Sequence, residues 1–278
     1  MPGMARSATF LLGCEKLGVD GSATVTRMHL VVRVGIETAV ILGALAPLVA
    51  IGMWSSGARA WRPLLALVAL VALDDLVLRL PGIGPFTALT WNWQGKLLEV
   101  GWVLALAATI RGLSLRDIGA TAPLRTGWRT PALVAGAVTL ALPLAFVVGL
   151  GARDQLTVEG WWFQATMPGL AEELVYRGVF LVLLDRAFGR PWRIAGAELG
   201  WGTIVMAVVF AAVHAVGVDR SGGVHIDPVF AVGPFIGSLV AGWARSRLGS
   251  LVPLILIHNA GNLVIPLVTL WLSATNHS

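Results

Sequence analysis

Long runs of apolar residues follow one another along this 278-residue sequence. Hydrophobic residues make up 56% of the chain and charged residues only 13%, which excludes an ordinary soluble domain. A bilayer core about 30 Å thick needs roughly 20 mostly apolar residues per helix. Because lipid leaves backbone groups no other partners, helices are the simplest solution for runs of this length. The predicted fold class is all-α, a multi-pass transmembrane helical bundle.

About eight apolar segments are long enough to be considered as spans. They lie at about residues 30–54, 63–79, 95–111, 131–151, 160–187, 199–217, 228–244 and 249–272. We predict an N-terminal tail over residues 1–28, which we expect not to be cleaved as a signal peptide. Residues 29–130 would form a first group of transmembrane helices and residues 131–278 a second group.

The basic residues lie mostly in the short connections between apolar segments rather than on one patch. We therefore expect no nucleic-acid partner, although the sequence pI is about 10.6. The connections after the odd-numbered segments carry eleven Lys and Arg residues, against seven in the opposite set. Cytoplasmic loops are enriched in these residues. Both termini are thus predicted outside, in the plasma or inner membrane of a bacterial host.

Two carboxylates and a guanidinium lie inside the fifth apolar segment, at Glu172, Glu173 and Arg177. Each ionisable group costs about 2.5–3.5 kcal/mol at the centre of a membrane helix, so such residues indicate a function. In an α-helix Glu173 and Arg177 share a face and can neutralise each other, whereas Glu172 is rotated by about 100°. This arrangement would leave Glu172 unpaired and available as a general base or acid. A purely structural ion network is the alternative. A further carboxylate, Glu99, could line a cavity.

Two later segments carry histidines. His214 ends the sixth segment, and His258 and Asn262 are one helical turn apart in the eighth. A single histidine in an apolar helix usually has a structural role, but two of them after the Glu-Glu pair favour a site. Proline is preferred in a first helical turn, so we expect a helix to begin near Pro168. Glu172 and His214 would then lie at a similar shallow depth, with His258 deeper.

Glu172-Glu173-x-x-x-Arg177, Phe210-x-x-x-His214 and His258-x-x-x-Asn262, in this order over about residues 160–270, resemble the motifs of the CPBP family. That family contains the CAAX prenyl endopeptidases and bacterial relatives often called Abi proteins. The resemblance implies that Glu172 and His214 activate the attacking water and that His258 and Asn262 stabilise the oxyanion. Glu173 and Arg177 would fix the helix and the local charge. The implied activity is intramembrane hydrolysis of a peptide bond in a membrane-associated protein or propeptide.

Glu172, His214 and His258 could alternatively hold zinc as a set of two histidines and one carboxylate. No His-Glu-x-x-His motif is present, and Asn262 suits an oxyanion donor better than a metal ligand, so we expect a metal-free reaction with no cofactor. Two other classes of function stay open. One is a catalytically silent immunity or assembly factor on the same scaffold. The other is a transporter, although the inverted repeats typical of transporters are not visible.

Overall fold

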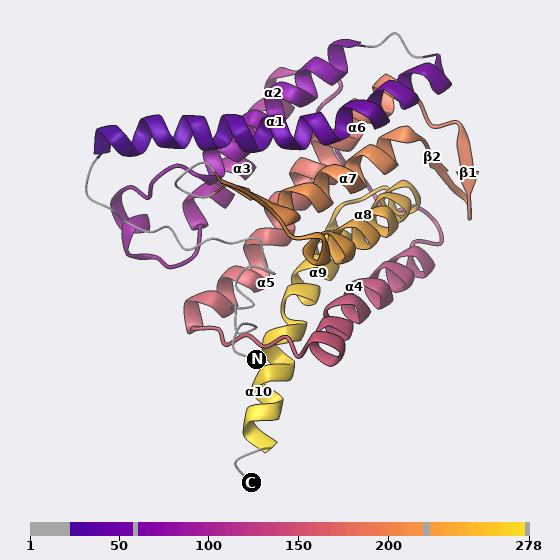
Figure 1. Cartoon of the computed structure of the whole chain (residues 1–278). Helices are drawn as coiled ribbons and strands as arrows, with labels where there is room; N and C mark the ends of the chain where they lie inside the picture. Colours follow the sequence, from indigo (N-terminus) through magenta and orange to yellow (C-terminus); the bar gives the residue numbers. More distant parts are fainter. Residues whose placement is uncertain (1–22, 58–60, 219–222, 276–278) are drawn as a thin grey trace.

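The computed structural model describes residues 23–57, 61–218 and 223–275, which are mostly helical (Figure 1). In chain order the elements are α1 (Ala23–Ser56), α2 (Trp61–Leu78), the 3-10 helix η2 (Gly84–Ala88), α3 (Trp93–Thr109), α4 (Arg129–Leu150), α5 (Val158–Glu172), the π-helix η3 (Glu173–Phe180), α6 (Leu181–Phe188), β1 (Trp192–Ile194), β2 (Ala197–Leu199), α7 (Trp201–Ala215), β3 (Val216–Val218), β4 (Val224–Ile226), α8 (Pro228–Leu248), α9 (Val252–Asn262) and α10 (Val264–Thr275). Helix α1 therefore includes residues 23–28, which were predicted as tail. Residues 1–22 lie outside the described part.

Four helical segments are long and apolar enough to cross a membrane, among the residues that the structure describes. They are Leu30–Ser56, Arg129–Leu150, Pro228–Leu248 and Val252–Thr275. The chain is thus an integral membrane protein, but the predicted number of about eight spans is not confirmed. Helix α7 is apolar but only 15 residues long. Helices α2 and α3 carry buried charged residues, and the predicted eighth span is divided by Leu263 into α9 and α10.

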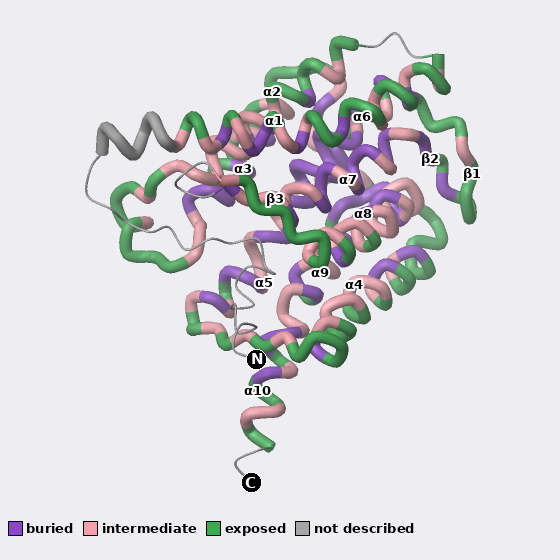
Figure 2. The backbone as a smooth tube through the Cα atoms, viewed as in Figure 1, coloured by how far each residue is buried: buried purple, intermediate pink, exposed green. Residues whose placement is uncertain are grey.

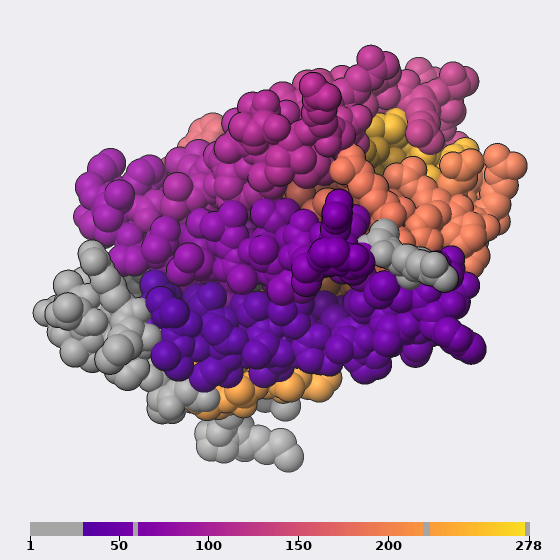
Figure 3. Space-filling view, turned by 90° about the horizontal axis from the view of Figure 1, so that it is seen from above, coloured from indigo at the N-terminus to yellow at the C-terminus, as the bar shows by residue number. Residues whose placement is uncertain are grey.

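The buried core is formed by η3, α6 and α7, which lie at the centre of the bundle (Figure 2). Phe180, Leu184 and Val209 are almost fully enclosed there. Helix α1 packs against α2, α6 and α7, and seen from above α1 and α2 lie side by side across one face of the molecule (Figure 3). Helices α4, α8 and α9 enclose the core from another side. Large apolar side chains on α1, α4, α8 and α10 point outward, as lipid contact requires.

Two short hairpins, which were not predicted, accompany the mostly helical fold. Strands β1 and β2 pair antiparallel around Ala195 and Gly196, which both have positive φ, at 47° and 77°. Such a pair is typical of a two-residue type I′ turn. Strands β3 and β4 also pair antiparallel and follow α7 directly. Arg33 Nε of α1 donates to the carbonyl oxygen of Val218 in β3 at 3.0 Å, which ties this hairpin to the first helix.

Helix α5 begins ten residues earlier than predicted. Its N-cap is Thr157, whose hydroxyl accepts from the Gly160 N–H at 3.2 Å, and Pro168 lies inside the helix rather than in its first turn. The Thr157 cap decided the start because it satisfies an otherwise orphaned donor. Glu172 is the fifteenth residue of α5, roughly 21 Å along the helix from Val158. The Glu-Glu pair is therefore deep in the bundle, not shallow as expected.

The orientation predicted from the basic residues can be tested by cysteine labelling. In a Cys14→Ser background, we expect a cysteine at exposed Ala88, after the second apolar segment, to react with a membrane-impermeant thiol reagent in intact cells. A cysteine at exposed Thr121, after the third segment, should react only after the cells are opened. The reverse pattern would invert the predicted topology.

Candidate active site

The Glu-Glu segment lies at a change of helix type. Glu172 is the last residue of α5, and Glu173–Phe180 continue as the π-helix η3, all of whose residues are buried. In a π-helix the hydrogen bonds run from i to i+5, which makes each turn wider, and such turns occur frequently at functional sites. The wider turn changes which side chains share a face. The sorting of Glu172 and Glu173 by α-helical spacing therefore holds only in part.

Glu173 and Arg177 form the ion pair that their spacing predicts. Arg177 Nη1 lies 3.1 Å from Glu173 Oε1, and both side chains are only 3% exposed. The Arg177 guanidinium also lies over the ring of Phe210, with its carbon 4.0 Å from the ring centroid. A desolvated cation over an aromatic face adds a further attraction. Arg177 is thus held from two sides, by η3 and by α7.

His258 lies between the two glutamates. Its Nδ1 is 2.9 Å from Glu173 Oε1, and its Nε2 is 3.6 Å from Glu172 Oε2. Because an ionised carboxylate only accepts hydrogen bonds, Nδ1 carries the proton in the bond to Glu173. The expectation that His258 lies deeper than Glu172 is therefore wrong. Because α5 begins at Val158, Glu172 at its end lies beside His258.

Glu172 is paired, against the prediction that it is left free. Lys96 Nζ of α3 lies 3.1 Å from Glu172 Oε1 and 2.8 Å from Glu99 Oε2. Lys96 and Glu99 are 5% and 0% exposed, so this contact is enclosed by protein. Among the described residues, no donor lies within hydrogen-bond distance of the second oxygen of Glu172, Oε2. Glu99 binds Lys96 and does not contribute to the cavity described below.

His214 is in the last turn of α7. Its Nδ1 lies 2.6 Å from the carbonyl oxygen of Phe210, which can only accept, so Nδ1 donates and Nε2 points elsewhere. The Phe210 ring contacts both histidines, with centroid distances of 4.6 Å to His214 and 6.2 Å to His258. Phe210 therefore acts as a spacer that holds the two imidazoles on one side of the core.

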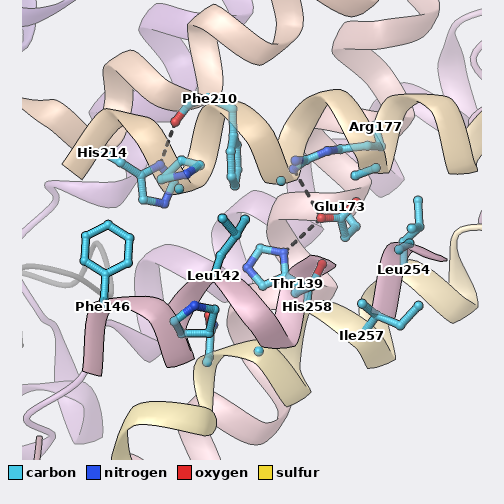
Figure 4. Close-up of a pocket in the computed structure, with 18 of the residues that line it drawn as sticks. Thr139, Leu142, Phe146, Glu173, Arg177, Phe210, His214, Leu254, Ile257 and His258 are labelled. Atoms are coloured by element: carbon cyan, nitrogen blue, oxygen red, sulfur yellow. Dashed lines mark hydrogen bonds and ion pairs between the residues drawn. The ribbon is translucent and has the colours of Figure 1, made fainter. Parts of the chain in front are cut away.

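The two histidines open into a cavity of about 170 Å³ between η3, α4, α7, α8 and α9 (Figure 4). His214, His258 and Asn262 line it together with Glu173 and Arg177, whereas Glu172 lies behind His258 and is not part of the lining. The structure thus brings three of the four predicted catalytic residues to one cavity and places the fourth in contact with one of them. The apolar part of the wall includes Leu142, Phe146, Phe230, Leu254, Ile257 and Ile265.

Asn259 is a site residue that the sequence analysis missed. Its Oδ1 accepts from the Gly169 N–H at 2.7 Å, and its Nδ2 donates to the Thr166 carbonyl at 3.2 Å. Pro168 lacks an N–H and disturbs the helical hydrogen bonds around it. The Asn259 amide supplies partners for this disturbed turn and so fixes α9 against α5. The neighbouring residue, His258, is thereby placed beside Glu172.

The proposed zinc ligands do not fit a metal centre in this arrangement. Among the described residues, no three His, Cys, Asp or Glu side chains are grouped so that they could hold a metal ion. The Lys96 ammonium occupies one oxygen of Glu172, and a second cation beside it would be repelled.

The model of a known protein family covers this site. The family described as type II CAAX prenyl endopeptidase Rce1-like matches residues 154–264. This match supports an assignment of residues 154–264 to the CPBP/CAAX protease family. The CAAX protease segment contains Glu172, Glu173, Arg177, His214, His258 and Asn262, whereas Lys96 lies before it. The family and the four apolar helices together support the assignment as a membrane-embedded, CAAX endopeptidase-like protease.

Two curated relatives are membrane sensor proteins. The chain is 25% identical over 200 residues to the membrane sensor protein UhpC of Escherichia coli strain K12 and 26% identical over 200 residues to that of Salmonella typhimurium. Each match covers 65% of this chain and 44% of the relative, so the chain spans less than half the length of these proteins. No solved structure matches.

The close approach of α5 and α9 predicts a strong effect at Gly169. A Cβ at this position would lie 2.5 Å from Asn259 Oδ1 and 2.6 Å from the Ile255 carbonyl oxygen. We expect Gly169→Ala to destabilise the protein by about 3 kcal/mol, since a backbone oxygen cannot rotate away. Thermal unfolding in detergent would measure this. Gly101→Ala, where nothing lies within 4 Å, is the matched control and should be neutral or stabilising. Equal stability of the two variants would contradict the packing argument.

Proposed function

We propose that this protein is an intramembrane endopeptidase that hydrolyses a peptide bond in a membrane-associated protein or propeptide. The observation that carries the proposal is the meeting of His214, His258 and Asn262 at one cavity, with Glu172 and Glu173 both in contact with the His258 ring. Four elements, α5, η3, α7 and α9, supply these groups. An ion network that served stability alone would not require two histidines and an amide around an empty volume.

In the proposed reaction Glu172 and His214 activate a water molecule. Glu172 Oε2 is the carboxylate oxygen that no described residue occupies, and it faces the cavity-lining ring of His258. It accepts the proton as the water oxygen attacks the carbonyl carbon of the substrate. General-base assistance of this kind contributes about 10²–10⁴-fold to a rate. The same proton then passes to the leaving amine nitrogen as the C–N bond breaks.

His258 and Asn262 are the proposed oxyanion donors. The Asn262 amide donates through Nδ2, and His258 donates through Nε2 when its ring carries a second proton, since Nδ1 is already bonded to Glu173. A donor aimed at the developing oxyanion in a water-poor site is worth about 2.7–4 kcal/mol. Glu173 orients His258 and is itself held by Arg177. The role of Glu173 and Arg177 is therefore to position the histidine.

The substrate segment is proposed to lie along the apolar wall of the cavity. Leu142 and Phe146 of α4 form part of this wall, and Figure 4 shows them on the side of the cavity that His214 and His258 line. Such a surface accepts apolar side chains or a lipid group next to the scissile bond. An apolar surface of this kind suits a substrate that is already anchored in the bilayer. The lipid bilayer is the second proposed partner.

The assignment of the base predicts different effects at two adjacent glutamates. Glu172→Gln keeps volume and hydrogen bonding but removes the base, so we expect activity to fall at least about 100-fold while the protein stays folded. Glu173→Gln leaves Arg177 buried without its counter-ion, so we expect a loss of roughly 3 kcal/mol in stability. As a control for the second change, Glu198→Gln breaks an exposed pair at 3.9 Å and should have little effect.

Activity can be measured with an internally quenched, S-farnesylated CAAX peptide and its unprenylated counterpart in mixed micelles. Protein termini in membranes from cells with wild-type or Glu172→Gln enzyme provide a second, substrate-independent comparison. If wild-type protein generates no new termini and cuts neither peptide, the proposed function is wrong. If Glu172→Gln retains wild-type turnover, the protease stands but the base has to be reassigned.

Metal dependence gives a separate prediction. We expect proteolysis to survive exhaustive chelation, because a metal ion at Glu172 would be repelled by the Lys96 ammonium and the described His, Cys, Asp and Glu residues form no group of three ligands. Elemental analysis should find no stoichiometric zinc in purified active enzyme. About one zinc per chain, lost together with activity in His214→Ala and His258→Ala, would show that these residues are ligands instead.

A further inference from the structure

Lys96 contacts the proposed base from outside the segment that matches the protease family. It is the fourth residue of α3, and its ammonium bridges Glu172 Oε1 at 3.1 Å and Glu99 Oε2 at 2.8 Å. The two acidic side chains are 11% and 0% exposed and the Lys96 side chain is 6% exposed. The N-terminal helices therefore contribute to the site itself, because α3 places the Lys96 ammonium against Glu172.

Hydrogen bonds at the start of helix α3 fix the position of the Lys96 ammonium. The Asn92 side chain caps the helix by accepting from the Gly95 N–H at 2.9 Å and donates to the Leu78 carbonyl at 2.6 Å. Gln94 accepts from the Ile83 N–H at 2.8 Å and donates to the Pro81 carbonyl at 3.1 Å. The start of α3 is thus bound to the end of α2 and to the following loop by the side chains of the N-cap and of the second helical residue.

The same end of α3 is docked onto α5, the helix that carries Glu172. Glu159 accepts from the backbone N–H groups of Thr90 and Trp91, each at 3.0 Å, and from Trp93 Nε1 at 3.2 Å. The rings of Trp91 and Trp93 both contact Phe163 of α5, at centroid distances of 5.3 Å. Helices α3 and α5 are therefore joined near the start of α5 by Glu159 and Phe163, and at its end by the Lys96–Glu172 pair.

We propose that Lys96 is a positioning residue for the protease reaction, which holds Glu172 ionised and turns its Oε2 toward His258. Binding of Oε1 by the ammonium leaves Oε2 as the oxygen that can take the proton from water. An opposite charge at this distance favours the ionised carboxylate, which is the form a general base requires. Glu99 balances Lys96, so that the pair carries little net charge into the bundle. This inference rests on the proposed function and extends the active site to α3.

The test compares Lys96→Met, Lys96→Arg and a matched control, Arg79→Met. Arg79 is also a partly buried cation of the first helices, but it pairs with Glu37 and Asp75, away from the site. Dicyclohexylcarbodiimide labels protonated carboxyl groups in apolar surroundings, and mass spectrometry after digestion reads out labelling at Glu172 separately from Glu173. This measurement needs no substrate and is made at neutral pH on the full-length protein in detergent.

We expect Lys96→Met to raise labelling of Glu172 at least about threefold, and to lower kcat at least about tenfold with KM changed less than about twofold. Lys96→Arg restores the charge and should return both labelling and most of kcat toward wild type. Arg79→Met should leave labelling of Glu172 unchanged. If Lys96→Met leaves Glu99 too poorly compensated for folding, the double variant Lys96→Met/Glu99→Gln removes both charges and should show the same labelling.

Unchanged labelling of Glu172, or an unchanged kcat, in a folded Lys96→Met or double variant would overturn the role of Lys96. So would a loss of activity in Lys96→Arg as large as in Lys96→Met. These outcomes leave the proposed function intact as long as wild-type enzyme cleaves and Glu172→Gln does not. A wild-type protein without protease activity would remove the proposed function itself, while the labelling still reports whether Lys96 controls the charge of Glu172.

Discussion

Charges that are buried in an apolar bundle must be neutralised by one another, and this constraint organises the centre of the molecule. Lys96, Glu172, His258, Glu173 and Arg177 form a continuous series of contacts that runs from α3 through α5 and α9 to η3. Each group has a neighbour of opposite or complementary character, so that no single charge is left alone in a low-dielectric surrounding. The helices that meet at the site are held there by the same contacts that would perform the chemistry.

Much of this arrangement could be predicted from local patterns. Apolar runs gave the helices, because a membrane imposes both length and composition on them. Glu173 and Arg177 are four residues apart and meet as expected, and His258 and Asn262 do line one cavity. The three motifs were informative because ionisable side chains in membrane helices cost free energy and usually have a function. The residues of the candidate site in the second half of the chain could therefore be named from the sequence.

Other features depended on contacts that one sequence does not reveal. Lys96 was counted among the connecting residues, because a lysine near the end of an apolar run normally reaches water. Its partner in the site, Glu172, is 76 positions away in sequence. Asn259 was passed over in favour of Asn262, although the Pro168-Gly169 pair in α5 signals a helix turn that needs outside partners. The type I′ turn at Ala195-Gly196 was missed because an alanine there adopts a conformation that it rarely takes.

The π-helical winding of η3 favours the arrangement of the site at the expense of helix stability. Wide turns of this kind are rare in helices, which indicates that a regular α-helix is the more favourable winding of most sequences. Removing one residue between Glu173 and Phe180 would permit such regular winding, but it would change which side chains within this segment share a face. Arg177 and Phe180 would then leave their partners on α7 and α3. A more regular and more stable winding of this segment would thus separate the side chains that η3 brings together.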